Sequence, residues 1–199
     1  DNEKSTSYTY AEFDCIVNQL SNGLTSLGVR KGDKVNLHLT NCPEFLFSMF
    51  AIAKLGAVMV PTNPLSPPAE LSYPVRHSDR VVSITQPDLL SGVLSIMDSC
   101  PKLDHVVVTG PKDTELAATN FTDLIEDQSS DLETITLDPL DEAAILYTSG
   151  TTSRPKGVLV THGNYVYLSE VVSKTMRLGP DDRQFITLPL FHANAQYYS

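Results

Sequence analysis

The segment from Tyr147 to Val158 concentrates the residue types that bind anionic oxygens. Its hydroxyl side chains are Thr148, Ser149, Thr151, Thr152 and Ser153, its glycines are Gly150 and Gly157, and its cations are Arg154 and Lys156. Consecutive small residues leave backbone N–H groups free to converge on an anion as a nest. Hydroxyl groups add donors that rotate to meet phosphate oxygens, and a lysine or arginine supplies the opposite charge. The sequence therefore predicts a polyphosphate-binding loop.

This loop differs from a Walker loop. Gly150 and Gly157 stand seven positions apart, and Lys156 precedes a glycine instead of following one. The apolar run Val158–Val160 predicts a strand after the loop, so no helix N-terminus is expected directly behind the phosphates. A hydroxyl-rich hairpin loop without a ligand is the alternative interpretation, because many polar surface loops have no function.

The spacing of apolar residues alternates between that of helices and that of strands along the chain, and these elements must position the loop. Apolar residues at three- and four-residue spacing predict helices after Thr9 up to Leu27, from Pro43 to about Leu55, over Ala69–His77, Leu89–Asp98 and Phe121–Glu126, and from Thr161 to Met176. Short apolar runs predict strands at Lys34–Leu39, Ala57–Val60, Val81–Thr85, His105–Thr109, Ala143–Tyr147, Val158–Val160 and Phe185–Leu188. Strands separated by helices need crossover connections, which indicates the α/β class, with a largely parallel sheet and helices on both faces.

Four segments depart from the simple alternation of helices and strands or invite a functional interpretation. Pro74 is expected to kink or shorten the helix in which it lies. Gly110–Asn120 is predicted to be a loop, and the acidic stretch Asp127–Asp141 to be a solvated connector. The stretch Asn41–Glu44 is assigned to core packing, and no activating partner supports Cys42 as a nucleophile.

Composition excludes several classes of function. The chain carries 14 Lys plus Arg against 24 Asp plus Glu, a net charge of −10, so it is expected to bind no nucleic acid. No apolar run is long enough to predict a membrane span. The three cysteines are odd in number and far apart, which argues against a disulfide framework or a zinc site and fits a reducing compartment such as the cytoplasm. A peroxisome or another organelle stays open as an alternative, because the chain starts with Asp1 rather than Met.

The loop also resembles the signature loop of the adenylate-forming (AMP-binding) superfamily, which includes acyl- and aryl-CoA synthetases, peptide-synthetase adenylation domains and luciferases. Other segments that resemble family landmarks follow in the expected order, at Tyr8–Tyr10, Gly28–Val35, Asn41–Phe45, Lys54–Pro61, Thr161–Asn164 and Leu188–His192. The residues from Thr148 to Gly157 are most similar to acyl-CoA synthetases of the carnitine/crotonobetaine-CoA ligase type. Ser153 stands where most members carry glycine, and this departure predicts a somewhat stiffer loop.

The resemblance implies an acid–thiol ligase. Members join a carboxylate to AMP with loss of pyrophosphate, and the CoA sulfur then attacks the acyl-adenylate, so ATP, Mg²⁺, CoA and a small carboxylic acid, as in fatty acid metabolism, are the implied partners. By similarity, the ATP phosphates would be held by Thr148, Ser149, Gly150, Thr151, Thr152, Ser153, Arg154, Lys156 and Gly157, and Thr148 would also meet the magnesium ion. His192 would lie near the reacting carboxyl as the catalytic residue, with Phe191 and Asn194 beside the carboxylate substrate.

Members of this superfamily are longer than 199 residues. The resemblance therefore implies that residues 1–199 are a partial N-terminal, AMP-binding domain, with the rest of that domain and the C-terminal lid domain absent. Such a fragment is expected to be inactive alone. Two alternatives stay open, an adenylation domain of a peptide-synthetase-like enzyme and a non-catalytic nucleotide-binding module.

Overall fold

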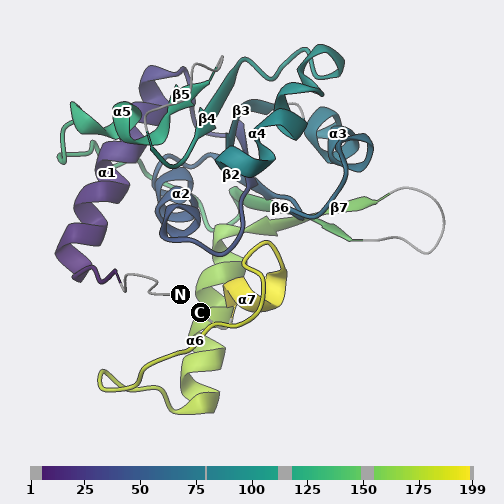
Figure 1. Cartoon of the computed structure of the whole chain (residues 1–199). Helices are drawn as coiled ribbons and strands as arrows, with labels where there is room; N and C mark the ends of the chain where they lie inside the picture. The colour runs from purple at the N-terminus through teal and green to yellow at the C-terminus, as the bar shows by residue number, and fades with distance from the viewer. Residues whose placement is uncertain (1–5, 79, 112–117, 149–154, 198–199) are drawn as a thin grey trace.

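One sheet organises the chain in the computed structural model, which describes residues 6–78, 80–111, 118–148 and 155–197. Its strands are β1 (Lys34–His38), β2 (Val58–Pro61), β3 (Arg80–Thr85), β4 (His105–Val108), β5 (Thr119–Asn120), β6 (Glu142–Thr148) and β7 (Lys156–Thr161), in the spatial order β5-β4-β3-β1-β2-β6-β7 (Figure 1). Every neighbouring pair is parallel except β6 and β7, which are antiparallel. The predicted α/β class with a largely parallel sheet is confirmed.

Helices cover both faces of this sheet. They are α1 (Tyr10–Ser26), α2 (Pro43–Lys54), α3 (Pro68–His77), α4 (Pro87–Leu94), α5 (Phe121–Glu126), α6 (His162–Met176) and α7 (Ala193–Tyr197). Residues of α1, α2 and α5 share one apolar cluster with Val107 of β4, whereas α3 and α4 share a second cluster with Val106 and Val108 of the same strand. Because successive strand residues point to opposite faces, the two clusters lie on opposite sides of the sheet.

Two helices begin at capping boxes that the sequence indicated by a threonine. The Thr9 hydroxyl accepts a hydrogen bond from the Glu12 amide at 3.2 Å, and the Glu12 carboxylate accepts one from the Thr9 amide at 2.7 Å. The bonds that the Thr9 amide and hydroxyl donate to this carboxylate lower the pKa of Glu12. Thr161 and Asn164 repeat the arrangement at the start of α6, the helix predicted from Thr161 to Met176.

A polar layer lies inside the sheet and joins its three central strands. The Asn36 side chain on β1 donates to the Val60 carbonyl of β2 at 2.8 Å and to the Thr62 hydroxyl at 2.9 Å. From β3, the Ser83 hydroxyl donates to Asn36 Oδ1 at 2.7 Å. His38 Nδ1 lies 3.0 Å from the same Thr62 hydroxyl, and all of these side chains are buried. A satisfied buried network of this kind favours one register of the strands, since any slip would leave polar groups without partners.

Several element boundaries differ from the sequence-based expectation. The helix predicted over Leu89–Asp98 begins two residues earlier and ends at Leu94, and a single 3₁₀ turn follows at Met97–Ser99. Helix α3 continues through Pro74 to His77, so the predicted shortening is wrong. The loop expected up to Asn120 ends in the two-residue strand β5.

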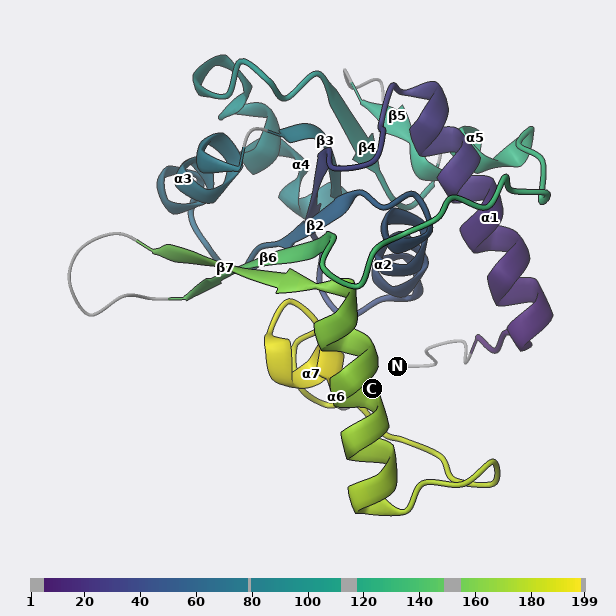
Figure 2. The same ribbon diagram turned by 180° about the vertical axis from the view of Figure 1, so that it is seen from behind.

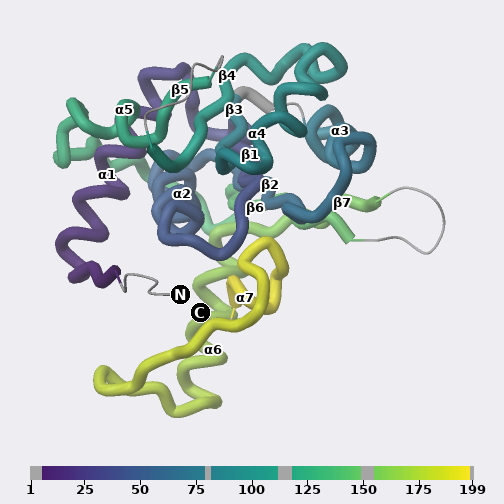
Figure 3. The backbone as a smooth tube through the Cα atoms, in the orientation of Figure 1, coloured from purple at the N-terminus to yellow at the C-terminus, as the bar shows by residue number. Residues whose placement is uncertain are grey.

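The strand predicted at Phe185–Leu188 is also wrong, because these residues form an irregular segment. The side chain of Phe185 is 90% exposed, so the apolar alternation that predicted the strand is not matched by burial. In Figure 3 this part of the chain returns along α6 toward α7.

A substitution at Leu37 of β1 tests how much the core contributes to stability. The Leu37 side chain is fully buried in the apolar cluster that also holds α1, α2 and α5. We expect Leu37→Ala to lower the free energy of unfolding by about 2–5 kcal/mol, through lost burial and the cavity left behind. Urea unfolding followed by circular dichroism measures the change. The matched control is Leu65→Ala, because Leu65 is 87% exposed. Equal effects of the two substitutions would contradict the assignment of Leu37 to the core.

Candidate active site

The β6–β7 hairpin brings two of the predicted phosphate-binding residues together. Thr148 at the end of β6 pairs directly with Lys156 at the start of β7, and both residues are exposed. Residues directly opposite in an antiparallel pair project from the same face, with Cβ atoms about 4.5–5.5 Å apart. A hydroxyl donor and an ammonium group therefore lie side by side at the end of the hairpin where β6 and β7 are connected. The predicted residues Ser149, Gly150, Thr151, Thr152, Ser153 and Arg154 lie outside the described residues.

Lys156 keeps its charge available in an otherwise acidic chain. Lys31 pairs with Asp141 at 2.7 Å, Lys54 pairs with Asp14, and Lys174 pairs with Glu170. Within the described ranges, by contrast, no ion pair involves Lys156. Its ammonium group can therefore accept an anionic ligand without first releasing a carboxylate.

Gly157 is required by packing inside the hairpin. A Cβ atom at this position would lie 2.8 Å from Cγ2 of Ile145 and 3.4 Å from Cζ of Tyr147, its cross-strand partner. The glycine leaves room for the Ile145 side chain, and the Tyr147 ring lies beside it on the face opposite to Thr148 and Lys156, since neighbouring residues alternate in direction. This packing accounts for the glycine without a ligand, and its predicted role in phosphate binding stays a prediction.

The second predicted group, around His192, lies on one turn before α7. His192 and Asn194 are exposed and Phe191 is half-buried, and the His192 ring lies 4.1 Å from that of Phe191. The His192 amide donates to the Pro189 carbonyl at 3.0 Å, which closes the turn. Figures 1 and 2 both place α7 beside α6 and below the β6–β7 hairpin. Among the described residues, no hydrogen bond or ion pair joins His192 to that hairpin.

Asn41 holds this turn, a role that the sequence-based assignment to core packing missed. Its side-chain nitrogen donates to the Leu188 carbonyl at 2.9 Å, and its oxygen accepts from the Leu190 amide at 2.8 Å. From the other side, Gln196 donates to the Leu190 carbonyl at 2.8 Å and accepts from the Tyr165 hydroxyl at 2.7 Å. Side chains thus bind the backbone groups of Leu188 and Leu190, at and just beyond the end of the segment predicted to be a strand.

Both groups lie at the same edge of the sheet. Asn41 follows the carboxyl end of β1, and Thr148 is the carboxyl end of β6, which runs parallel to β2 and hence to β1. In open α/β sheets, ligands bind outside the carboxyl ends of the strands. One signal in the sequence pointed this way for Asn41, since a polar residue directly after a strand and before Pro43 occupies this edge.

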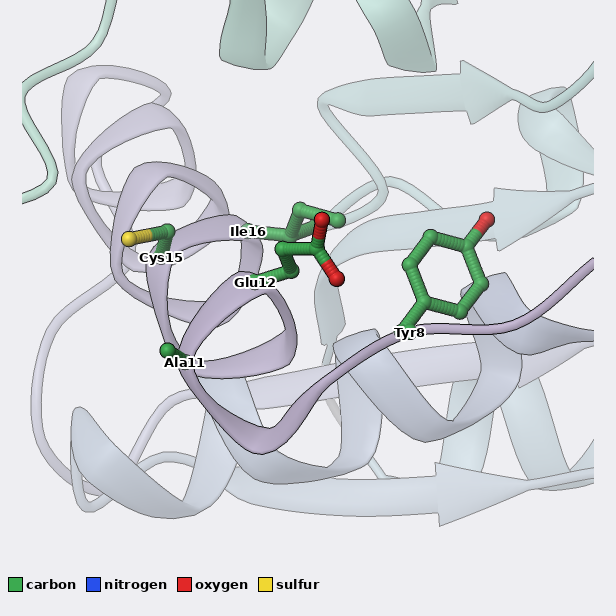
Figure 4. A pocket seen from close by; sticks show the side chains of 5 residues that line it. All are labelled: Tyr8, Ala11, Glu12, Cys15 and Ile16. Carbon is green, nitrogen blue, oxygen red and sulfur yellow. The ribbon is translucent and has the colours of Figure 1, made fainter.

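A surface pocket elsewhere carries none of the predicted chemistry. It has a volume of about 430 Å³ and is lined by Tyr8, Ala11, Glu12, Cys15 and Ile16, which belong to α1 and the residues before it (Figure 4). In the parts of the chain that are described, no group of three or more His, Cys, Asp or Glu side chains could hold a metal ion. No described helix is long and apolar enough to cross a membrane.

The Asn41 contacts predict a measurable loss of protection in the His192 turn. In Asn41→Ala, the Leu190 amide loses its acceptor, and we expect its hydrogen exchange to accelerate at least about fivefold, as one hydrogen bond contributes about 1 kcal/mol. Asn22→Ala is the matched control, because Asn22 also donates to two backbone carbonyls, those of Ser129 and Asp131. Equal Leu190 exchange in the two variants would contradict the anchoring role.

Thiol labelling tests the environment of Cys42. Burial raises the pKa of its thiol to about 12, so at pH 8 only about one thiol in ten thousand is the reactive thiolate. We expect iodoacetamide at pH 8 to alkylate the exposed Cys15 while Cys42 stays unmodified, as read by peptide mass mapping. In denaturant both thiols should react. Labelling of Cys42 as fast as Cys15 in the folded protein would show that the thiol is activated.

Sequence comparison places these features among known proteins. The profile of the family described as AMP-binding enzyme matches residues 2–199. The crotonobetaine/carnitine–CoA ligase of Salmonella agona (strain SL483) is 37% identical over 192 residues, and that of Escherichia coli O127:H6 is 37% identical over 195 residues. Each match covers 95% of this chain and 37% of the relative. The chain therefore spans little more than a third of the length of these curated relatives.

Solved structures give the same result for the fold. An anthranilate CoA ligase, AuaEII, in complex with anthranoyl-AMP has a TM-score of 0.90 at 31% identity, over 97% of this chain and 39% of that chain. The ATP-bound MatB of Rhodopseudomonas palustris has a TM-score of 0.87 at 28% identity, over 98% of this chain and 37% of that chain. Together with the family profile over residues 2–199, these matches show that the chain belongs to the AMP-binding enzyme family.

Proposed function

We propose that this chain supplies the phosphate-binding part of an ATP-dependent acyl-CoA synthetase. The observation that carries the proposal is the pairing of Thr148 with Lys156 at the two ends of the hydroxyl- and glycine-rich segment. Membership of the AMP-binding enzyme family supports it, as do the CoA ligases among the relatives.

The proposed reaction has two steps. A carboxylate oxygen of the substrate attacks the α-phosphorus of ATP, the bond to the β-phosphate breaks, and pyrophosphate leaves with the electron pair. The CoA sulfur then attacks the acyl carbon of the acyl-adenylate, and AMP leaves. In the first step the protein must hold the phosphates in line and offset the charge that builds on the leaving group.

The hairpin fits that task. The Lys156 ammonium, unpaired within the described residues, would neutralise charge on the β- and γ-phosphates, and the Thr148 hydroxyl beside it would donate to a phosphate oxygen. Magnesium generally keeps several waters and binds phosphate oxygens with few protein ligands, so one oxygen from Thr148 fits its needs. A bound magnesium ion would supply additional charge neutralisation to the same phosphates.

The turn around His192 is the proposed carboxylate side of the site. His192 and Asn194 expose polar side chains at the edge of the sheet where Thr148 ends, and Phe191 offers an aromatic wall. The related ligases are named for crotonobetaine and carnitine and for anthranilate, all of which carry a carboxylate. We therefore assign a small carboxylic acid as the substrate class, with His192 near the reacting carboxyl.

The chain would be one part of the complete catalytic unit. We assign residues 1–199 to the N-terminal, AMP-binding domain, and expect the remaining length seen in the relatives to supply the rest of that domain and a C-terminal lid. On this assignment the 199 residues alone give no adenylation above background. The free thiols Cys15, Cys42 and Cys100 support a reducing compartment such as the cytoplasm.

Carboxylate-dependent exchange of labelled pyrophosphate into ATP tests this function in the protein expressed from its complete coding sequence. We expect Lys156→Ala to lower kcat/KM for ATP by about 10- to 150-fold, because a charged hydrogen bond contributes about 1.5–3 kcal/mol. Lys174→Ala is the control. Lys174 is an exposed lysine whose ion pair with Glu170 lies on α6, and we expect it to change the rate less than twofold.

Three results would contradict the proposal. ATP binding without exchange for any carboxylate in a broad panel would support a non-catalytic nucleotide-binding module. Exchange with transfer only to a protein-tethered pantetheine, and none to CoA, would support a peptide-synthetase-like enzyme. Full exchange activity in Lys156→Ala would remove the hairpin from the site.

A further inference from the structure

The face of the hairpin opposite to Thr148 and Lys156 is tied to helix α3 by a cluster of three rings. His77, the last residue of α3, places Nδ1 2.8 Å from the Tyr147 hydroxyl. The rings of Tyr73 and His77 stack with their centroids 5.3 Å apart, and the Tyr147 ring lies nearly perpendicular to both, with its centroid 6.3 Å from that of Tyr73 and 5.9 Å from that of His77. The cluster therefore joins α3 to the residue that directly precedes Thr148.

Tyr147 is held on its other side by the hairpin itself. Its ring covers Gly157, where even a Cβ atom would lie only 3.4 Å from Cζ of the tyrosine. The ring thus lies against the backbone of Gly157. Tyr147 and Gly157 form the ladder pair next to that of Thr148 and Lys156.

This tie matters because the described ladder pairing between β2 and β6 is short. The described pairing between β2 and β6 consists of Met59 with Ala144, so beyond Ala144 the ladder partner of β6 is β7. Figures 1 and 2 show both strands extending past the sheet beside α3. Two-stranded hairpins are marginally stable on their own in water, so side-chain contacts must hold such an extension in place.

We propose that His77 is a positioning residue for the phosphate site, acting through its hydrogen bond to Tyr147. The inference rests on the proposed function, because it assumes that Thr148 and Lys156 bind ATP phosphates. His77 touches neither of these residues directly. It fixes Tyr147 over Gly157 and thereby keeps the hydroxyl of Thr148 and the ammonium of Lys156 at one separation before the ligand arrives, which removes an ordering cost from binding.

Binding of MgATP and of inorganic tripolyphosphate to the protein from its complete coding sequence, measured by calorimetry without carboxylate, tests this role. Tyr147→Phe keeps the ring and removes the hydroxyl, and His77→Leu removes the nitrogen. Each is expected to weaken tripolyphosphate binding about fivefold, the effect of one hydrogen bond. His77→Asn places an amide atom near the position of Nδ1 and is expected to stay within twofold of the parent.

The double variant distinguishes the hydrogen bond from general loss of packing. If the bond is what acts, His77→Leu with Tyr147→Phe binds tripolyphosphate no more weakly than either single variant. The control is Tyr167→Phe, which removes a hydroxyl from a 68% exposed tyrosine on α6 and should change nothing. Melting temperatures of all variants verify that they fold.

The variant Lys156→Ala distinguishes failure of the His77 role from failure of the proposed function. If Lys156→Ala weakens tripolyphosphate binding and the His77 and Tyr147 variants do not, the positioning role is wrong while the proposed function stands. Additive losses in the double variant, or no rescue by His77→Asn, would also overturn it. If Lys156→Ala leaves binding unchanged, the proposed function fails and the role of His77 fails with it.

Discussion

The arrangement of the sheet depends on the polar layer that fixes β1 between β2 and β3. Asn36 uses its amide to bind a β2 carbonyl and the Thr62 hydroxyl, and accepts the Ser83 hydroxyl of β3. A buried layer whose polar atoms each require one partner adds to the register that apolar burial already specifies, because a slip would leave those atoms unpaired. The position of β2 then decides the position of β6, because Met59 pairs with Ala144. The polar layer thus holds β2, and β2 is the strand beside which β6 of the hairpin pairs.

The same strands determine the second half of the candidate site. Beyond the end of β1, Asn41 holds the turn before His192 by two hydrogen bonds to its backbone. Residues 188–190 are about 150 positions away along the chain, so the contact is formed only when the tertiary structure brings the segments together. The hairpin and the turn are consequently both positioned at the carboxyl edge of the central strands, although no hydrogen bond among the described residues links them directly. This is the edge at which parallel sheets bind ligands.

Local patterns in the sequence predicted the elements that depend on local physics. The apolar periods of α1 and α2, the helix start at Thr161 and the strands from β1 to β4 gave the expected structure, and the paired positions of Thr148 and Lys156 follow from a strand on each side of the loop. The failures involve distant partners. Phe185–Leu188 has the alternation of a strand, but side chains of Asn41 and Gln196 satisfy the backbone around Leu188 and Leu190. Neither that contact nor the bond from His77 to Tyr147 has any signature in spacing, because each joins side chains from separate elements.

The excess of negative charge and the proposed polyphosphate ligand are compatible because the charges are arranged locally. Lys31, Lys54 and Lys174 each face a carboxylate, which offsets their fields over short distances. At physiological salt, exposed charges more than about 8 Å apart are largely screened from each other, so the net charge of −10 has limited influence on a ligand at the hairpin. What the ligand meets there is Lys156, with no ion pair among the described residues, next to the hydroxyl of Thr148. If the proposed function holds, the strand register and the tie to α3 therefore matter more to phosphate binding than the overall charge, because they present these two groups together.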